Sequence, residues 1–74
     1  MSPSAVERGA DTRHRLLGAT AAVIARDGWG AVTTRRVAEE AGLTSGLVHY
    51  HFSSVDDLRR QATVAALDRF LVPV

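Results

Sequence analysis

The sequence predicts an all-α fold: a three-helix bundle that contains a helix-turn-helix, followed by the start of a fourth helix. Three observations predict it. Apolar residues recur at helical spacing from Asp11 onward. Glycine, serine and threonine stand at the intervals where helices end and begin. Residues 28–32, which interrupt the periodicity, are too few and too rich in glycine for a strand.

The composition fits one small domain. The 74 residues are 46% hydrophobic and leave no room for a second core. Catalytic clefts rarely fit in such a chain, so we expect neither enzymatic activity nor a cofactor. The absence of cysteine excludes disulfides and Cys-based zinc sites. Because no signal peptide or membrane-spanning stretch is visible, we expect a cytoplasmic protein without a membrane segment.

The amino-terminal part divides into an arm and a helix. Residues 1–10 carry Ser, Pro, Gly and single charges without periodicity, so we expect a flexible arm there. An apolar face then predicts a first helix from about Thr12 to Asp27. Asp11 or Thr12 is expected to cap its start, and Gly28 to end it.

The next segment is a short connection followed by a short helix. In the connection, residues 28–32, we expect the bulky Trp29 and Val32 to cover the end of the core. Thr33 or Thr34 then stands where it would cap a second helix. That helix has room for about two turns before Gly42 closes it.

Two further helices complete the pattern. The third helix is expected at about residues 45–51, with Thr44 or Ser45 as its cap. The fourth is expected to start near Ser54, where serines precede two aspartates in the capping pattern, and to lose its periodicity at Pro73.

The apolar positions of these helices are expected to form one core without a ligand pocket. Its expected members are Leu16, Leu17, Val23, Ile24, Val37, Ala38, Val48, Phe52 and Leu58. The late part of the fourth helix is more apolar than the domain can cover. Its stripe of Val64, Leu67 and Leu71 is therefore expected to be exposed and to pack against another surface.

The second and third helices form a helix-turn-helix, a unit whose second helix can enter the major groove of DNA. The net charge of +1 does not itself indicate a nucleic-acid partner. The placement of polar residues does, because hydroxyls, guanidinium groups and backbone N–H groups gather where both helices begin. Arg35 is the one nearby side chain suited to a bidentate contact with guanine.

The chain resembles the TetR (tetracycline-repressor-like) family of transcriptional regulators. The residues that carry the resemblance are Leu16-Leu17, Gly28-Trp29 and the run TTRRVAEEAGLTSGLVHYHF, followed by SSVDDL. It implies a homeodomain-like amino-terminal domain that binds operator DNA, and a carboxy-terminal domain that dimerises and holds a small-molecule effector. We therefore expect a DNA-binding domain at residues 11–58 and, at residues 59–74, a linker helix toward an absent second domain.

The resemblance also implies a homodimeric repressor whose recognition helix, residues 45–51, reads the major groove. The residues it places against DNA are Thr33, Thr34, Arg35, Thr44, Ser45, Gly46, Leu47, His49, Tyr50 and His51. In two places the chain departs from the family pattern. Many members have Tyr at the position of His49 and Lys at the position of Val55, so we expect one phosphate contact fewer and modest affinity.

Other interpretations stand beside this one. Arg35 and Arg36 can form solvated pairs with Glu39 and Glu40 at i,i+4 spacing. His49 and the histidine two positions on point to different faces of a helix, so no metal site is expected. The chain can also be a helical protein-interaction module that docks through its apolar carboxy-terminal helix. A small effector-binding regulator is a third interpretation, without a pocket visible in the sequence.

Overall fold

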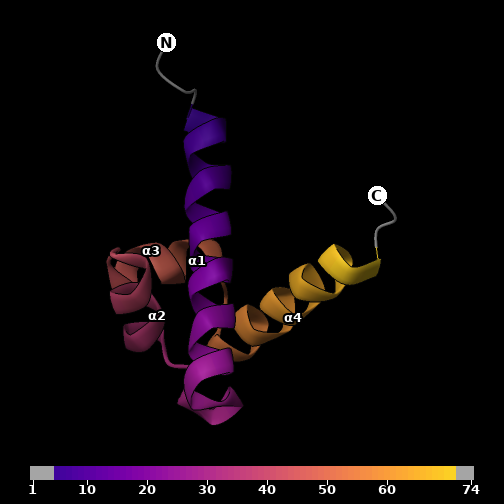
Figure 1. Ribbon diagram of the computed structural model, residues 1–74. Helices are drawn as coiled ribbons and strands as arrows, with labels where there is room; N and C mark the ends of the chain where they lie inside the picture. Colours follow the sequence, from indigo (N-terminus) through magenta and orange to yellow (C-terminus); the bar gives the residue numbers. More distant parts are fainter. Residues whose placement is uncertain (1–4, 72–74) are drawn as a thin grey trace.

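A computed structural model describes residues 5–71 of the chain, with side chains for residues 8–68. Its elements, in order, are α1 (Ala5–Asp27), the 3-10 turn η1 (Trp29–Ala31), α2 (Thr34–Ala41), α3 (Ser45–His51) and α4 (Val55–Leu71). The described residues contain no strand, which confirms the expected all-α class. In Figure 1, α1 forms the long axis, with α2 and α3 beside it, and α4 runs out on the other side.

The first helix begins earlier than expected. α1 starts at Ala5 and runs unbroken through Asp11 and Thr12, so neither of these residues caps its start and residues 5–10 are not a flexible arm. The physical reason is that extending an existing helix costs far less than nucleating one, and alanine and glutamate in this segment favour the helix. Residues 1–4 of the expected arm lie outside the described residues.

Two glycines end helices where the sequence places them. Gly28 follows α1 with φ 92°, and its amide donates to the carbonyl of Ile24 at 2.9 Å. Gly42 follows α2 with φ 69° in the left-handed region, and its amide donates to the carbonyl of Glu39 at 3.2 Å. A side chain at either position would be strained, because L-residues rarely adopt a positive φ.

The core lies between α1 and the other helices. Every expected core residue is buried except Ile24, which is partly buried against the others. The core also contains Ala19, Thr20, Val32 and Ala62. The hydroxyl of Thr20 is satisfied inside the core because it donates to the carbonyl of Leu16, one turn earlier on the same helix, at 2.7 Å.

Trp29 does not cover the end of the core, contrary to the expectation. Val32, the other residue expected there, is buried at 1% exposed, whereas Trp29 is 50% exposed. The indole instead lies under the guanidinium of Arg59 on α4, whose central carbon is 5.9 Å from the ring centroid. This contact connects η1 to α4 at the molecular surface.

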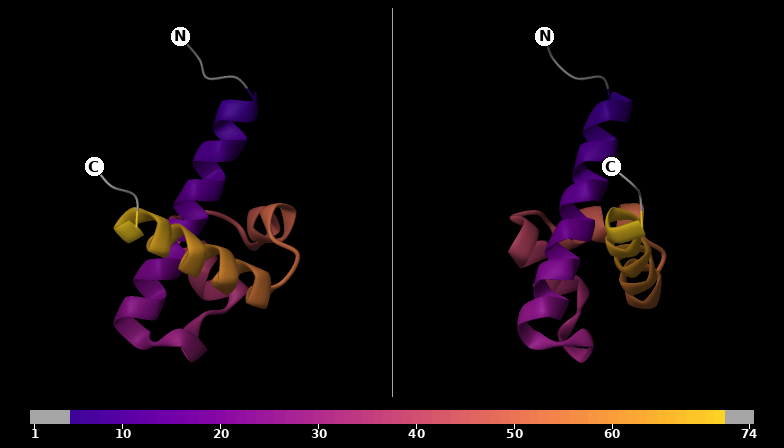
Figure 2. Two further views of the ribbon diagram at one scale, coloured as in Figure 1. Left: turned by 90° about the vertical axis from the view of Figure 1, so that its right-hand side faces the viewer. Right: turned by 45° about the vertical axis from the view of Figure 1, so that its right-hand side comes forward.

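α4 starts with a reciprocal cap, as its sequence predicts. The Ser54 hydroxyl accepts from the amide of Asp57 at 3.0 Å, and the Asp57 carboxylate accepts from the amide of Ser53 at 3.2 Å. α4 then crosses α1, as Figure 2 shows, and buries Leu58 and Ala62 against it. The expected boundary between residues 58 and 59 thus falls within a continuous helix.

Farther along α4, Val64 and Leu67 are 53% and 52% exposed, as expected for an uncovered apolar stripe. The side chain of Leu71, the third member of the stripe, lies outside the described residues. Among residues 5–71, no helix has the length and hydropathy needed to cross a membrane.

Two leucines of α4 test this division between core and surface. Leu58→Ala should lower the free energy of unfolding by about 3 kcal/mol, because it leaves a cavity at a fully buried position. Leu67→Ala, at a position that is 52% exposed, should change it by less than about 0.5 kcal/mol. Urea unfolding followed by circular dichroism measures both values, and equal losses would contradict the packing of α4 on α1.

Candidate nucleic-acid interface

The helix-turn-helix presents two helix starts that are each capped by a threonine. The Thr33 hydroxyl accepts from the amide of Arg36 at 3.0 Å, and the Thr44 hydroxyl accepts from the amide of Leu47 at 3.4 Å. These contacts decide between the alternatives left open by the sequence, since α2 begins after Thr33 and α3 after Thr44. Each hydroxyl accepts with a lone pair and keeps its hydrogen, so each cap can still donate to a phosphate.

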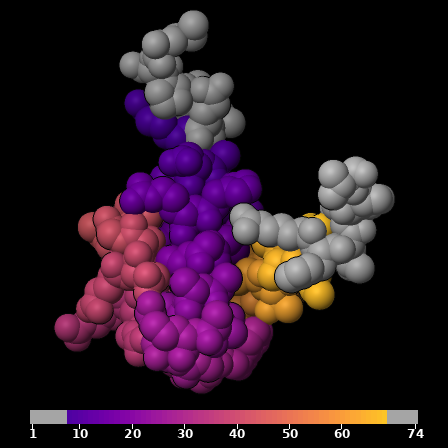
Figure 3. Space-filling model, in the orientation of Figure 1, coloured from indigo at the N-terminus to yellow at the C-terminus, as the bar shows by residue number. Residues whose placement is uncertain are grey.

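α3 has one face in the core and one in solvent. Val48 and the C-cap residue Phe52 are each 3% exposed and anchor the helix. The opposite face, which we call the α3 outer face, consists of Ser45, Gly46, His49 and Tyr50, all exposed. In the space-filling view, α2 and α3 stand out from one side of α1 (Figure 3). The outer face is therefore open to a large partner.

Tyr50 is the most exposed large apolar side chain of the described residues, at 81%. Its ring meets the half-buried ring of His51 edge to face, with the centroids 5.0 Å apart. This contact restricts how Tyr50 projects from the helix. An aromatic ring held outward on a short helix can contact a sugar or a thymine methyl group.

Gly46 has no neighbour that requires a glycine. A Cβ added there would meet only the Thr44 hydroxyl, at an ordinary contact distance of 3.8 Å. Its φ is not positive either. The fold therefore tolerates a side chain at this position, and any need for a glycine must come from outside the chain.

Arg35 is 87% exposed and pairs with Glu39, 61% exposed, through Nε and Oε1 at 3.0 Å. The expected i,i+4 pair is thus present. Exposed pairs of this kind contribute little to stability, because water screens them and both side chains lose freedom. Arg35 can therefore leave Glu39 to bind a phosphate or a guanine edge at little cost in free energy.

Arg36 does not pair with Glu40, contrary to the expectation. It donates to Asp27 at the end of α1, and Glu40 instead accepts from Arg26. The expected i,i+4 pair does not form because the end of α1 lies against α2, so that Asp27 and Arg26 become the partners of Arg36 and Glu40. Hydrogen bonds from Arg26 and Arg36 hold the pKa of Asp27 below its ordinary value of 3.8. Arg36 is thus engaged within the protein, in a network that fastens α1 to α2.

Arg15 was missed by the sequence analysis. From α1, it donates to the carbonyl of Ala41, the last residue of α2, at 2.9 Å. It thereby satisfies one of the carbonyls that a helix end leaves free, next to the turn at Gly42. No spacing rule predicts this contact, since it joins residues far apart in the chain.

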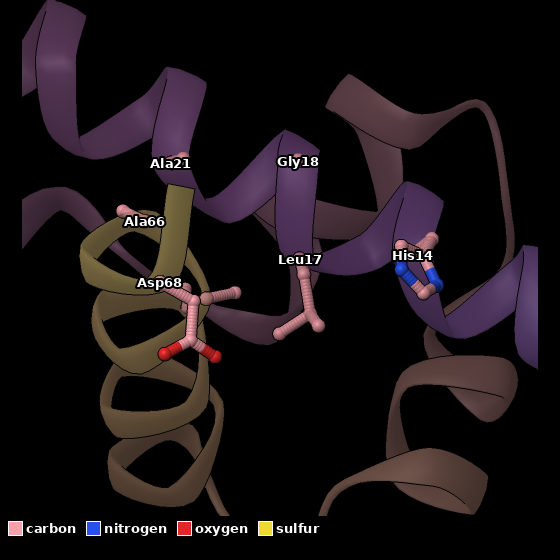
Figure 4. Close-up of a pocket in the computed structure, with 8 residues that line it drawn as sticks. His14, Leu17, Gly18, Ala21, Ala66 and Asp68 are labelled. Atoms are coloured by element: carbon pink, nitrogen blue, oxygen red, sulfur yellow. The ribbon is translucent and has the colours of Figure 1, made fainter. Parts of the chain in front are cut away.

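A separate surface groove of about 430 Å³ lies between α1 and α4 and was not predicted. The groove is lined from both helices, and Figure 4 shows His14, Leu17, Gly18 and Ala21 along α1 and Ala66 and Asp68 on α4. The groove contains none of the residues that the sequence predicts to contact DNA. Within residues 8–68, no group of three or more metal-ligating side chains is present.

The helix-turn-helix and its surroundings match a known family. The model of the bacterial regulatory proteins of the TetR family matches residues 16–62, which contain α2, α3 and the start of α4. The chain belongs to this family. Members of the TetR family are DNA-binding transcription regulators and not enzymes. No curated protein and no solved structure matches the chain.

The structure places the predicted DNA-contacting residues of this TetR-family chain together. All of them lie at the starts of α2 and α3 or along α3. All are exposed except Thr34, Leu47 and His51, which are half-buried. Their contact with DNA stays a prediction.

The network around Asp27 predicts a dependence of stability on acid. Because the pKa of Asp27 is lowered by folding, its contribution is present above pH 3.8 and is lost as the pH falls through the folded-state value. The pKa of Asp57 is also lowered, first by the hydrogen bond from Gln61 and then by that from Arg60. The midpoint of urea unfolding should therefore be level above about pH 5 and fall below about pH 4.

In Asp27→Asn the midpoint should be lower at neutral pH, and its decline in acid should be shallower. Asp27→Asn combined with Asp57→Asn should flatten the profile further. An acid decline as steep in the double variant as in the unmutated chain would contradict the role given to these carboxylates.

Proposed function

We propose that the chain is the DNA-reading part of a TetR-type repressor, which blocks transcription by occupying operator DNA with α3 in the major groove. The α3 outer face carries this proposal. It is exposed, the opposite face is buried in the core, and α2 packs against α3. A single α-helix fits the width of the major groove, and its first residues then reach the base edges.

The side chains suggest how such a site reads DNA. Ser45 supplies a hydroxyl, whereas Gly46 and Leu47 supply no donor and contact thymine methyl groups. Arg35 has the planar fork that pairs with guanine, and its exposure leaves it free to do so.

The remaining predicted contacts go to the phosphate backbone and fix the register of the helix on the duplex. They comprise the hydroxyls of Thr33, Thr34 and Thr44 and the side chains of His49, Tyr50 and His51.

The proposed assembly is a cytoplasmic homodimer. Two copies of α3 then enter successive major grooves, about 34 Å apart. In this arrangement residues 11–58 bind DNA, and residues 59–74 lead into a carboxy-terminal domain that dimerises and holds a small-molecule effector. The exposed Val64 and Leu67 on α4 support this, since a following domain would cover them.

The same two residues favour a second candidate, a module that docks on a protein partner through α4. Val64→Ser combined with Leu67→Ser separates the two candidates. The double substitution leaves duplex binding by this chain unchanged under the first proposal. Under the second candidate, the double substitution abolishes binding to the protein partner, and the unmutated chain does not bind duplex DNA.

A titration of fluorescent duplex DNA tests the interface. Arg35→Ala should weaken duplex binding at low salt by about tenfold and relax any preference for guanine, because it removes the bidentate contact with that base. Tyr50→Ala should weaken binding as well. The matched control is Arg60→Ala, because Arg60 is 76% exposed and pairs with an acidic residue as Arg35 does, but lies on α4. The control should change affinity by less than about twofold.

Fluorescence anisotropy at two salt concentrations measures these values. A folded chain that binds no duplex at low salt would overturn the proposed function. Equal losses of affinity in Arg35→Ala and Arg60→Ala would show that the start of α2 is not part of the DNA interface.

Gly46 provides a test in which stability and binding move in opposite directions. Gly46→Ala should raise the free energy of unfolding by about 0.5 kcal/mol, because alanine is the better helix former and the site is open. It should nevertheless weaken DNA binding by about tenfold, since the new methyl group occupies the space of a base edge.

Gly18→Ala is the control for this substitution. Gly18 is also helical and open, but it lies on α1, so its replacement should stabilise the fold and leave DNA affinity unchanged. Undiminished DNA binding by Gly46→Ala would show that the start of α3 does not approach a base closely.

A further inference from the structure

The side chain of Arg59 on α4 is folded against the protein and makes several internal contacts. Its side chain is 20% exposed. It donates to the carbonyl of Val32 at 3.2 Å and to the carboxylate of Asp56 at 2.9 Å, and its guanidinium lies over the Trp29 ring. Its Nε is buried without a hydrogen-bond partner among the described residues. The guanidinium is thus fixed on three sides.

The carbonyl that Arg59 holds lies at a particular place in the chain. Val32 is the C-cap of η1, and the next residue, Thr33, is the N-cap of α2. Val32 is also 1% exposed, so its carbonyl has little access to water. One side chain of α4 therefore fixes the backbone from which α2 starts.

A direct phosphate contact does not explain these observations. Arg35 and Arg60 are 87% and 76% exposed, whereas Arg59 is folded against the protein and its fork is occupied. An apolar side chain in place of Arg59 would pack over Trp29 but would leave the Val32 carbonyl without a donor. The hydrogen bond to the backbone just before α2 therefore depends on the guanidinium.

We propose that Arg59 is a positioning residue for DNA binding: by donating to the Val32 carbonyl while it lies over the Trp29 ring, it sets the place of the first turn of α2, and hence of Thr34 and Arg35. The proposal rests on the proposed function of the α2–α3 surface. It assigns a part in DNA binding to α4, which carries none of the predicted contacts.

A double-mutant cycle with Arg35 tests the proposal. Arg59→Met keeps the length and apolar packing of the side chain but loses the hydrogen bonds. Under conditions where circular dichroism shows a folded chain, it should weaken duplex binding by about fivefold. In that background Arg35→Ala should cost only about twofold, against about tenfold in the unmutated chain, because Arg35 is already displaced.

Arg60→Met is the matched control. Arg59 and Arg60 are neighbours on α4, and each pairs with an aspartate three residues earlier. Arg60→Met should leave affinity within about twofold, and its effect should add to that of Arg35→Ala. Arg59→Lys keeps the charge and N–H donors on a single nitrogen but lacks the planar fork, so its affinity should lie between those of Arg59→Met and the unmutated chain.

Hydrogen exchange supplies a readout that does not depend on DNA. The amides of Arg36 and Val37 donate to the hydroxyl and the carbonyl of Thr33, both at 3.0 Å, and so report on the start of α2. In Arg59→Met both amides should exchange about tenfold faster, because local opening becomes easier there. The amide of Leu47, which is bonded to the cap of α3, should exchange at an unchanged rate.

The outcomes separate this proposal from the proposed function. A chain that binds no duplex overturns the proposed function and the role of Arg59 with it. Normal binding by the unmutated chain, combined with unchanged exchange of Arg36 and Val37 in Arg59→Met, overturns the role of Arg59 alone. Strict additivity of Arg59→Met with Arg35→Ala does the same.

Discussion

One buried stripe of α1 supports the rest of the molecule. Leu16, Thr20 and Val23 on this stripe are fully buried, and α2, η1 and α4 all pack against the same helix. A chain of 74 residues has no second core that could take over this task. α3 joins the core through Val48 and Phe52 and otherwise rests on α2. The direction in which the α3 outer face points is therefore set by α1.

Four arginines of this protein have different tasks. Arg35 stands free in solvent with one acidic neighbour, whereas Arg36 belongs to the network that joins α1 to α2. Arg15 donates to the carbonyl of the last residue of α2, and Arg59 donates to the carbonyl of Val32, the residue before the N-cap of α2. The short second helix is thus held at both ends by arginines of other helices. The number of basic residues therefore does not indicate how many are bonded within the protein and how many are exposed to a partner.

The features that local sequence determines were predictable. The bounds of α2 and α3 follow from a threonine before each helix and from Gly42, because caps act within one turn. The start of α1 was not predictable, since Gly9 and the missing apolar periodicity of residues 1–10 favour an arm, whereas the helix runs through Gly9 to Ala5. The partners of Arg36 and Arg59 depend on which helices meet, and the Arg59 contact joins residues 27 positions apart. The sequence predicts which side chains form the candidate site, but it does not predict the contacts from other helices that hold α2 in place.

The position of Trp29 has a consequence for how this protein appears in spectroscopy. Phe52 is the only aromatic side chain in the core of the described residues, and it absorbs weakly in the near ultraviolet. The chain has one tryptophan, which sits at the surface against Arg59. The fluorescence of Trp29 therefore reports on whether the contact between η1 and α4 is intact, and not on unfolding of the core. Unfolding curves from fluorescence and from far-ultraviolet dichroism separate whenever that junction opens first.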